Sequence, residues 1–309
     1  MRLYRYGDPS SPRVAVSVGD GRIDLLEALG ELEGGSSADH LLRAFSSMES
    51  LVAAGPSAWA DAERVASSSA QLERVVVPEE ARILAPLRPS SLRDFLAFED
   101  HMKRGAQRRG GDVPSYWYDA PVYYKGNHRS IIGPEETCPW PSYAGRLDLE
   151  LELAMIVGRA GRDVSRERAA EHVFGFTIFN DFSARDVQAK ELSAWLGPAK
   201  AKDFANALGP CIVTADEVGA EPDLAMVCRV NGEEWGRARS SEVFWSWADM
   251  VAHVSRDEVI EPCDVYGSGT PGGCCGLDLG KELQTGDVVE LEIESIGVLR
   301  NRVGERRQG

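Results

Sequence analysis

The sequence lacks the features that mark several large classes of protein. No apolar run reaches the roughly 18 residues that a membrane-spanning helix needs, and Met1–Asp8 contains no secretion-type apolar segment. Its six cysteines show no C-x-x-C pair and no Cys/His spacing of a zinc site, which predicts reduced and mostly buried thiols. Together these absences predict a cytoplasmic protein that neither enters nor crosses a membrane.

Basic residues are scarce relative to acidic ones. The chain has 34 Lys and Arg against 49 Asp and Glu, a formal net charge of -15, and this argues against nucleic acid as a partner because phosphate binding needs clustered cations. A Gly-x-Ser-x-Gly nucleophile elbow is missing, as is a Cys/His nucleophile signature, so covalent catalysis is not expected. Internal repeats and coiled-coil heptads are also absent.

What is present fits a folded protein of two unequal parts. At 309 residues the chain exceeds the usual length of one domain, and its hydrophobic content of 43% is ordinary for a globular protein. Prolines at 86 and 89 suggest a boundary near residue 88, between a small N-terminal α/β domain (1–88) and a larger domain (89–309). The smaller domain is expected to contain strands at 2–6 and 13–18 around the turn Gly19-Asp20-Gly21, two helices within 37–70 separated at Gly55-Pro56, and short strands at 75–77 and 83–87.

The larger part is expected to contain more strands and fewer helices. Helical patterns are expected only at 165–173 and near 185–192. The remaining periodic segments read as strands, at 122–125, 147–157, 175–178, 211–214, 226–230 and 288–297. The predicted fold class is therefore α+β, mainly β.

One of these strands carries two acidic residues on the same face. In Leu147–Ala154 the alternation places Glu150 and Glu152 side by side, about 6–7 Å apart along the backbone, with leucines on the opposite face. Such a pair can bind a metal or can simply face water. The segment Val289–Glu294 alternates in the same way, so the pattern alone does not distinguish a metal site from a solvated strand face.

Other polar clusters accompany this strand. Asp94 precedes His101 by seven residues. The segment Asn180–Gln188 follows a predicted strand and begins a helix in which Arg185 and Gln188 lie on one face. Lys202 and the loop Gly267-Ser268-Gly269-Thr270 complete the set. In this order, these pieces resemble the fumarylacetoacetate hydrolase family.

The resemblance implies a fold and a set of roles. The catalytic domain would be the family's mixed β-roll, from about residue 89 onward, with a homodimer as the expected assembly. Four carboxylates would bind the metal, and an all-oxygen set suits Mg²⁺ first, with Mn²⁺ or Ca²⁺ as alternatives. The implied metal ligands are Asp94, Glu150, Glu152 and Asp181, the implied base is His101, the implied oxyanion-stabilising group is Arg185, Gln188 and Lys202, and the implied substrate contacts are Tyr124 and Thr270.

The implied activity is hydrolysis of a carbon-carbon bond in a 1,3-dicarbonyl acid, an acylpyruvate or a fumarylacetoacetate-like compound, by water that His101 activates. The same scaffold also supports decarboxylation or keto-enol isomerisation of related acids, which is the alternative. A second alternative is a member that binds metal and acid without catalysis. In small members of the family a Glu one helical turn after the His orients it, but Arg104 stands there in this chain, which leaves the partner of His101 open.

Overall fold

A computed structural model describes residues 1–33, 39–68 and 75–306 of the protein. Strands dominate these residues, and the predicted mainly β class of α+β fold is confirmed. The largest sheet has ten strands. Across it run β3 (Gly21–Asp24), β2 (Ser11–Val18), β1 (Arg2–Asp8), β12 (Asn206–Thr214), β10 (Val173–Asn180), β9 (Leu151–Val157), β15 (Asp264–Gly267), β4 (Ser91–Phe95) and β5 (Tyr123–Gly126), with β6 (Ile131–Ile132) paired to β12.

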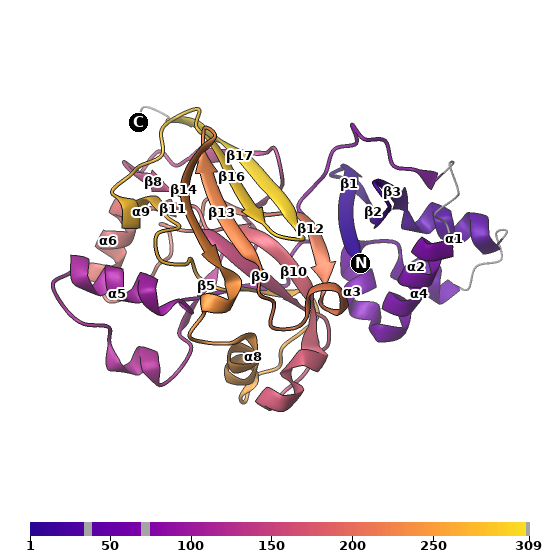
Figure 1. Ribbon diagram of the computed structural model, residues 1–309, viewed down its shortest axis with the longest axis horizontal. Coiled ribbons are helices and arrows are strands. Elements are labelled where there is room, and N and C mark those ends of the chain that lie inside the picture. Colours follow the sequence, from indigo (N-terminus) through magenta and orange to yellow (C-terminus); the bar gives the residue numbers. More distant parts are fainter. Residues whose placement is uncertain (34–38, 69–74, 307–309) are drawn as a thin grey trace.

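A second sheet of five strands packs near the first, and a two-stranded pair lies at its edge (Figure 1). The five are β14 (Glu233–Arg239), β13 (Ala225–Val230), β16 (Val288–Ile293), β17 (Gly297–Arg306) and β7 (Thr137–Trp140), and the pair is β8 (Leu147–Asp148) with β11 (Ser183–Ala184). The helices within residues 25–68 gather at one end of the molecule, and the helices at 99–108, 185–193 and 276–279 lie at the other (Figure 1).

The helices have the following bounds. Those of the N-terminal part are α1 (Leu25–Glu33), α2 (Asp39–Ala44), α3 (Met48–Ala54) and α4 (Pro56–Ser68). Those of the larger part are α5 (Glu99–Arg108), α6 (Arg185–Ser193), α7 (Ala215–Val218), α8 (Trp247–Ser255) and α9 (Gly276–Leu279), with 3-10 turns η2 (Ser115–Tyr118), η3 (Arg166–His172) and η4 (Ser240–Glu242).

Two hydrophobic cores lie on opposite faces of the large sheet. Alternate residues of β9 pack into the two cores. Leu151 and Leu153 belong to the core shared with the five-stranded sheet, whereas Ala154 and Ile156 belong to the core beneath the N-terminal helices. Full burial of a leucine or isoleucine side chain contributes about 1.5–3 kcal/mol. The two faces of β9 are therefore both dry, and any polar side chain on them is cut off from water.

Several predicted elements need correction. The segments 75–77 and 83–87 are not strands; they contribute only isolated bridges, Val76 to Ile23 and Ile83 to Tyr6. The long strand predicted over 147–157 is interrupted, because Glu150 leaves the ladder to bridge Cys275. Helices α1, α5 and α8 were not predicted. The helical stretch predicted over 37–70 falls partly on residues outside the described ranges. Within the described residues it forms three helices instead of the expected two, and the break at Gly55-Pro56 is confirmed.

The N-terminal hairpin is continuous with the rest of the protein, since β1 pairs antiparallel with β12. The domain boundary near residue 88 remains a prediction. All six cysteines are buried and free, as expected. Among the described residues, no helix combines the length and apolar character needed to cross a membrane.

Candidate active site

Four acidic side chains meet inside the protein, and they are the four predicted metal ligands. Asp94 lies on β4, Glu152 on β9, Glu150 just before β9, and Asp181 just after β10. Because β4, β15, β9 and β10 are successive neighbours in the sheet, these positions converge, and one oxygen from each residue lies within 4.8 Å of the others. We call this set the acidic cluster.

Burial distinguishes the Glu150/Glu152 segment from the Glu290/Glu292 segment, although the two alternate in the same way in the sequence. Glu152 is 0% exposed and Glu150 is 6% exposed. By contrast, Glu290 and Glu292 on β16 lie on a partly exposed face, where Glu292 pairs with Arg229 over 2.6 Å. The same alternation therefore gives a solvated face in β16 and a buried acidic pair at the start of β9.

Three buried oxygens of the acidic cluster have no hydrogen-bond partner among the described residues. They are Asp94 Oδ1, Glu152 Oε1 and Asp181 Oδ1. A buried carboxylate oxygen without a donor costs free energy, so an arrangement that gathers three of them is stable only if something positive satisfies them. Hard oxygen donors of this kind suit Mg²⁺, Mn²⁺ or Ca²⁺, and the residues present therefore fit a divalent cation.

The electrostatics of the acidic cluster point the same way. Burial, together with the charge of Asp181, raises the pKa of Asp94 well above its usual value, and burial with the charge of Asp94 does the same to the pKa of Glu152. Burial also raises the pKa of Asp181, although Lys202 opposes it. The cluster holds more negative charge than its neighbours neutralise.

Glu150 is the exception, because two cations hold it. Burial alone would raise its pKa, but the charges of Arg185 and Lys202 outweigh burial and lower it. Lys202 donates to Glu150 Oε2 over 2.5 Å and also to Asp181, and Arg185 donates to Glu150 Oε1 over 2.8 Å. Glu150 is therefore an ionised carboxylate fixed at both oxygens.

The predicted oxyanion group is thus brought to the cluster, but its cations are occupied by carboxylates. Arg185 also donates to Asp148 over 2.7 Å and to the amide oxygen of Gln188 over 3.0 Å. Because Arg185 takes the carbonyl oxygen of Gln188, the amide nitrogen is the end of that side chain that can donate to a substrate. In this arrangement Arg185 positions Glu150.

Asp148, which the sequence did not indicate, contacts the predicted site residue Arg185. Its carboxylate is buried and accepts hydrogen bonds from the backbone N–H groups of Gly276 (2.7 Å) and Leu277 (2.9 Å) as well as from Arg185. These are the first residues of α9, whose unpaired N–H groups an acidic side chain satisfies well. Asp148 therefore ties the acidic cluster to α9.

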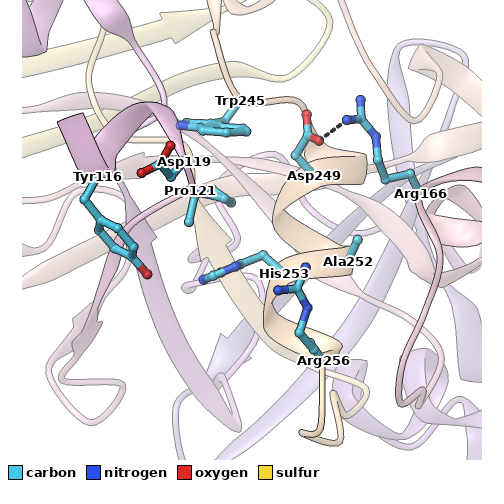
Figure 2. A pocket seen from close by; sticks show the side chains of 10 residues that line it. Tyr116, Asp119, Pro121, Arg166, Trp245, Asp249, Ala252, His253 and Arg256 are labelled. Carbon is cyan, nitrogen blue, oxygen red and sulfur yellow. Dashed lines mark ion pairs between the residues drawn. The ribbon is translucent and has the colours of Figure 1, made fainter.

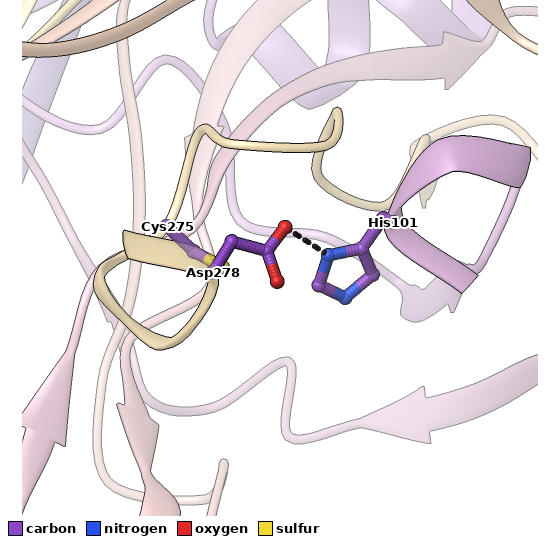
Figure 3. Close-up of side chains that lie close together, drawn as sticks. All are labelled: His101, Cys275 and Asp278. Atoms are coloured by element: carbon purple, nitrogen blue, oxygen red, sulfur yellow. Dashed lines mark hydrogen bonds and ion pairs between the residues drawn. The ribbon is translucent and has the colours of Figure 1, made fainter. Parts of the chain in front are cut away.

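Helix α9 supplies the partner of His101 that the sequence left open. His101 projects from α5, and its Nδ1 lies 3.0 Å from Asp278 Oδ2 (Figure 3). Burial would raise the pKa of Asp278, but its hydrogen bond and charge interaction with His101 outweigh burial and lower the pKa well below its usual value. Since an ionised carboxylate only accepts, Nδ1 of His101 must be the donor, which leaves Nε2 free as the basic nitrogen of the neutral ring.

Arg104, at the position that suggested an orienting residue, instead pairs with Asp100 on the same exposed helical face over 2.7 Å. No pattern in the sequence links Asp278 to His101, because the two residues are joined only by the meeting of α5 and α9. The His-Asp pair is close to the acidic cluster, since the backbone of Cys275, the residue before α9, bridges Glu150.

The two predicted substrate contacts have protein partners. The Tyr124 hydroxyl donates to Asp181 Oδ2 over 2.8 Å, and burial raises the pKa of this phenol well above its usual value. Thr270 is buried and its hydroxyl donates to the carbonyl oxygen of Cys274 over 3.2 Å. Tyr124 thus belongs to the wall of the acidic cluster, and Thr270 stabilises the loop that leads to α9.

A separate cavity of about 440 Å³ lies between η2 and α8, and none of the predicted site residues lines it. Figure 2 shows Tyr116, Trp245, His253 and Arg256 around it, with Arg166 and Asp249 paired over 2.6 Å at its rim. Burial and the charge of Arg256 lower the pKa of His253. Nothing in these contacts connects the cavity with the acidic cluster.

Comparison with known proteins agrees with the fold. Residues 91–304 match the family model described as fumarylacetoacetate (FAA) hydrolase, C-terminal. This match covers more than half of the chain, so the protein belongs to the fumarylacetoacetate hydrolase family and is an enzyme of that family.

Individual relatives refine this membership. The chain is 29% identical over 231 residues to oxaloacetate tautomerase YisK of Bacillus subtilis, covering 73% of this chain and 74% of that protein. It is 34% identical over 184 residues to the human mitochondrial oxaloacetate tautomerase FAHD2A, 59% of each chain. The structure of fumarylacetoacetate hydrolase from Exiguobacterium antarcticum superimposes with a TM-score of 0.75 at 27% identity, covering 99% of this chain and 100% of the other.

Proposed function

We propose that this protein is a divalent-metal-dependent tautomerase that interconverts the keto and enol forms of a 2-oxo dicarboxylic acid such as oxaloacetate. The observation that carries the proposal is the way in which the basic side chains around the acidic cluster are paired. One acid-base group, His101, is fixed by an ionised carboxylate, while Arg185 and Lys202, which hydrolysis would need for a tetrahedral oxyanion, are bound to carboxylates of the cluster. Keto-enol exchange needs an acid-base group such as His101 but does not need free cations to stabilise a tetrahedral oxyanion.

In the proposed reaction Asp94, Glu150, Glu152 and Asp181 would hold the cation. A divalent cation supplies Lewis acidity toward the carbonyl oxygens of the substrate and offsets the charge of the cluster. Nε2 of His101 takes a proton from the carbon between the two carbonyl groups, and the electron pair of that bond moves to the carbonyl oxygen, which becomes the enol oxygen on protonation. Asp278 stabilises the imidazolium that forms, and Tyr124 and Lys202 hold Asp181 in place.

The names of the bacterial and human relatives support this choice over the hydrolase that the sequence motifs first suggested. A second candidate, cleavage of an acylpyruvate by activated water, is favoured by one observation: a His-Asp pair with a free Nε2 can deprotonate water, and the Gln188 amide could donate to an oxyanion. A homodimer and the preference for Mg²⁺ stay predictions.

The two reactions are distinguished by their products. Chelator-treated protein reloaded with Mg²⁺ or Mn²⁺ is mixed with the enol form of oxaloacetate and, separately, with acylpyruvates, and enol absorbance is followed with product analysis by NMR. We expect metal-dependent loss of enol absorbance without fragmentation, and a much lower rate of this loss in His101→Ala. Two acid fragments from an acylpyruvate would favour the second candidate, and carbon dioxide release would indicate a decarboxylase. Metal binding with no turnover of any compound would indicate a non-catalytic member.

A further inference from the structure

A second group of metal-ligand side chains lies beside the acidic cluster. His101 on α5, and Cys275 and Asp278 at the start of α9, each offer one ligand atom, and these atoms lie within 4.8 Å of one another (Figure 3). Cys275 has no part in the proposed tautomerase reaction. We propose that these three residues form a second metal site, which takes Zn²⁺ in preference to Mg²⁺.

The donor chemistry sets this site apart from the acidic cluster. One imidazole nitrogen, one thiolate sulfur and one carboxylate oxygen are the ligands that Zn²⁺ and similar borderline-soft ions prefer, whereas four carboxylates suit hard ions. A neutral imidazole, a thiolate and a carboxylate also carry two negative charges, which match a divalent cation. When the ion binds, the thiol of Cys275 releases its proton to solvent, and the ring proton of His101 moves from Nδ1 to Nε2 by exchange with solvent, so that Nδ1 can coordinate the ion.

The geometry needs little adjustment. Ligands about 2.0–2.3 Å from a tetrahedral zinc ion are roughly 3.3–3.7 Å from each other. His101 Nδ1 and Asp278 Oδ2 are already 3.0 Å apart, and the sulfur lies within the 4.8 Å limit that the group satisfies. Three protein ligands leave one tetrahedral position for water or an anion, as in open zinc sites.

The carboxylate at the centre of this group is held in place by its surroundings. Arg108 donates to Asp278 Oδ1 over 2.6 Å, and the backbone N–H of Gly273 donates to Oδ2 over 3.0 Å. The side chain of Asp278 is 0% exposed and that of His101 is 13% exposed, so the site is shielded yet open at the histidine. Outer partners of this kind fix first ligands of metal sites and strengthen binding.

Occupation of this site would remove His101 from acid-base work. Zinc would then inhibit the enzyme while Mg²⁺ supports it, with the two ions at different sites a short distance apart. The inhibition rests on the proposed function, but the binding does not, so the two are tested by separate measurements.

Cobalt(II) provides the binding measurement, since it substitutes for zinc and reports its ligands. Chelator-treated protein, kept reduced, is titrated with Co²⁺ and then with Zn²⁺ as competitor. We expect intense tetrahedral visible bands and a sulfur-to-cobalt charge-transfer band in the near ultraviolet, both displaced by Zn²⁺ and not by Mg²⁺. In Cys275→Ala the charge-transfer band should vanish, and zinc affinity should fall by at least the roughly 10–100-fold that loss of an outer-shell partner costs.

Two variants serve as controls. Cys274→Ala makes the same change one residue earlier and should keep the band, and Glu152→Gln alters the acidic cluster but not this site. Only weak octahedral bands in the wild-type protein, or a charge-transfer band that survives in Cys275→Ala, would overturn the proposal. Zinc inhibition of enol exchange is then measured for the wild type, Cys275→Ala and Cys274→Ala, each relative to its own Mg²⁺-supported rate. A tetrahedral sulfur site in a protein without tautomerase activity would refute the proposed function but not the proposed zinc site.

Discussion

Asp278 accepts a hydrogen bond from Nδ1 of His101 over 3.0 Å, although 177 positions separate the two residues in the chain. The contact exists because Asp148 holds the first turn of α9 against the acidic cluster and α5 packs alongside. A carboxylate that fixes the tautomer of a histidine makes its other nitrogen a competent base. The pair therefore links the position of a distant helix to the chemistry of the site.

The first prediction concerns this pair. His101→Ala should lower the rate of enol exchange by roughly 10²–10⁴-fold, the range that general acid-base catalysis contributes. Asp278→Asn should lower kcat by part of that amount and shift the pH-rate profile, because an amide can also donate to Nδ1 and so favour the wrong tautomer. Both are measured with the metal-loaded enzyme over a range of pH.

Arg104→Ala is the matched control for Asp278→Asn. Arg104 makes only an exposed pair with Asp100, and such pairs contribute about 0–1 kcal/mol to stability. Its rate and pH profile should stay near those of the wild type. If Arg104→Ala proved as damaging as Asp278→Asn, the assignment of Asp278 as the residue that orients His101 would be wrong.

The second prediction concerns metal binding by the acidic cluster. Mg²⁺ or Mn²⁺ should raise the melting temperature of chelator-treated protein, since a ligand at about 100 times its Kd adds about 2.7 kcal/mol to the free energy of unfolding. Glu152→Gln should abolish most of this increase because it removes a ligand charge. Glu292→Gln makes the same change on a partly exposed strand face and should leave the increase intact.

The third prediction follows from the raised pKa values of Asp94 and Glu152. A carboxyl whose pKa is higher in the folded state binds more protons there, so its contribution to stability is present below the unfolded pKa and is lost as pH rises through the folded pKa. Without metal, the folded protein should therefore be more stable at about pH 6 than at about pH 8.

Metal should change this dependence, because cation and protons compete for the same oxygens. The rise in melting temperature caused by Mg²⁺ should be larger at the higher pH. Thermal melts in chelator and in Mg²⁺ across this pH range measure both effects, with Glu152→Gln expected to flatten the curve obtained in chelator. A metal-free melting temperature that climbs steadily from about pH 6 to pH 8 would contradict the assignment of the raised pKa values.

Much of the acidic cluster was predictable because its four acidic residues lie within short sequence motifs. Alternation in the sequence placed Glu150 and Glu152 on the same side of the chain. The resemblance supplied Asp94 on β4 and Asp181 just after β10, and all four residues converge. The burial that distinguishes this pair from Glu290 and Glu292 was not predictable, because it depends on what packs against each strand.

Contacts made between distant elements escaped prediction for the same reason. Asp278 and Asp148 carry no local pattern, and their roles arise only when α9 meets α5 and β8. Helix α5 was also missed, although it carries His101: six of its ten residues, Glu99, Asp100, Lys103, Arg104, Gln107 and Arg108, are charged or amide side chains, and few apolar residues mark its buried face. The strands predicted at 75–77 and 83–87 have β-forming residues, but they lack partners that extend beyond single bridges.

The last prediction concerns Gly267, which lies on β15 between two carboxylates of the acidic cluster. A Cβ at this position would lie 2.6 Å from Asp94 Oδ1 and 2.7 Å from Glu152 Oε2, closer than such atoms approach in proteins. Gly267→Ala should therefore push these carboxylates apart and weaken metal binding more than it lowers stability. Gly30→Ala, where an added Cβ meets nothing within 4 Å in helix α1, should be neutral or stabilise the protein by up to about 1 kcal/mol.

Calorimetric titration of both variants with Mn²⁺ separates the two effects, since chelator melts report the fold and the titration reports the site. We expect a Gly267→Ala protein that melts near the wild type but binds Mn²⁺ at least about tenfold more weakly, which would locate the cation between β4 and β9. A tenfold change in affinity is only about 1.4 kcal/mol, and a small displacement of one carboxylate is enough to cause it. Unchanged Mn²⁺ affinity would mean that the cation is held elsewhere, and that the unpaired oxygens of Asp94 and Glu152 have another purpose.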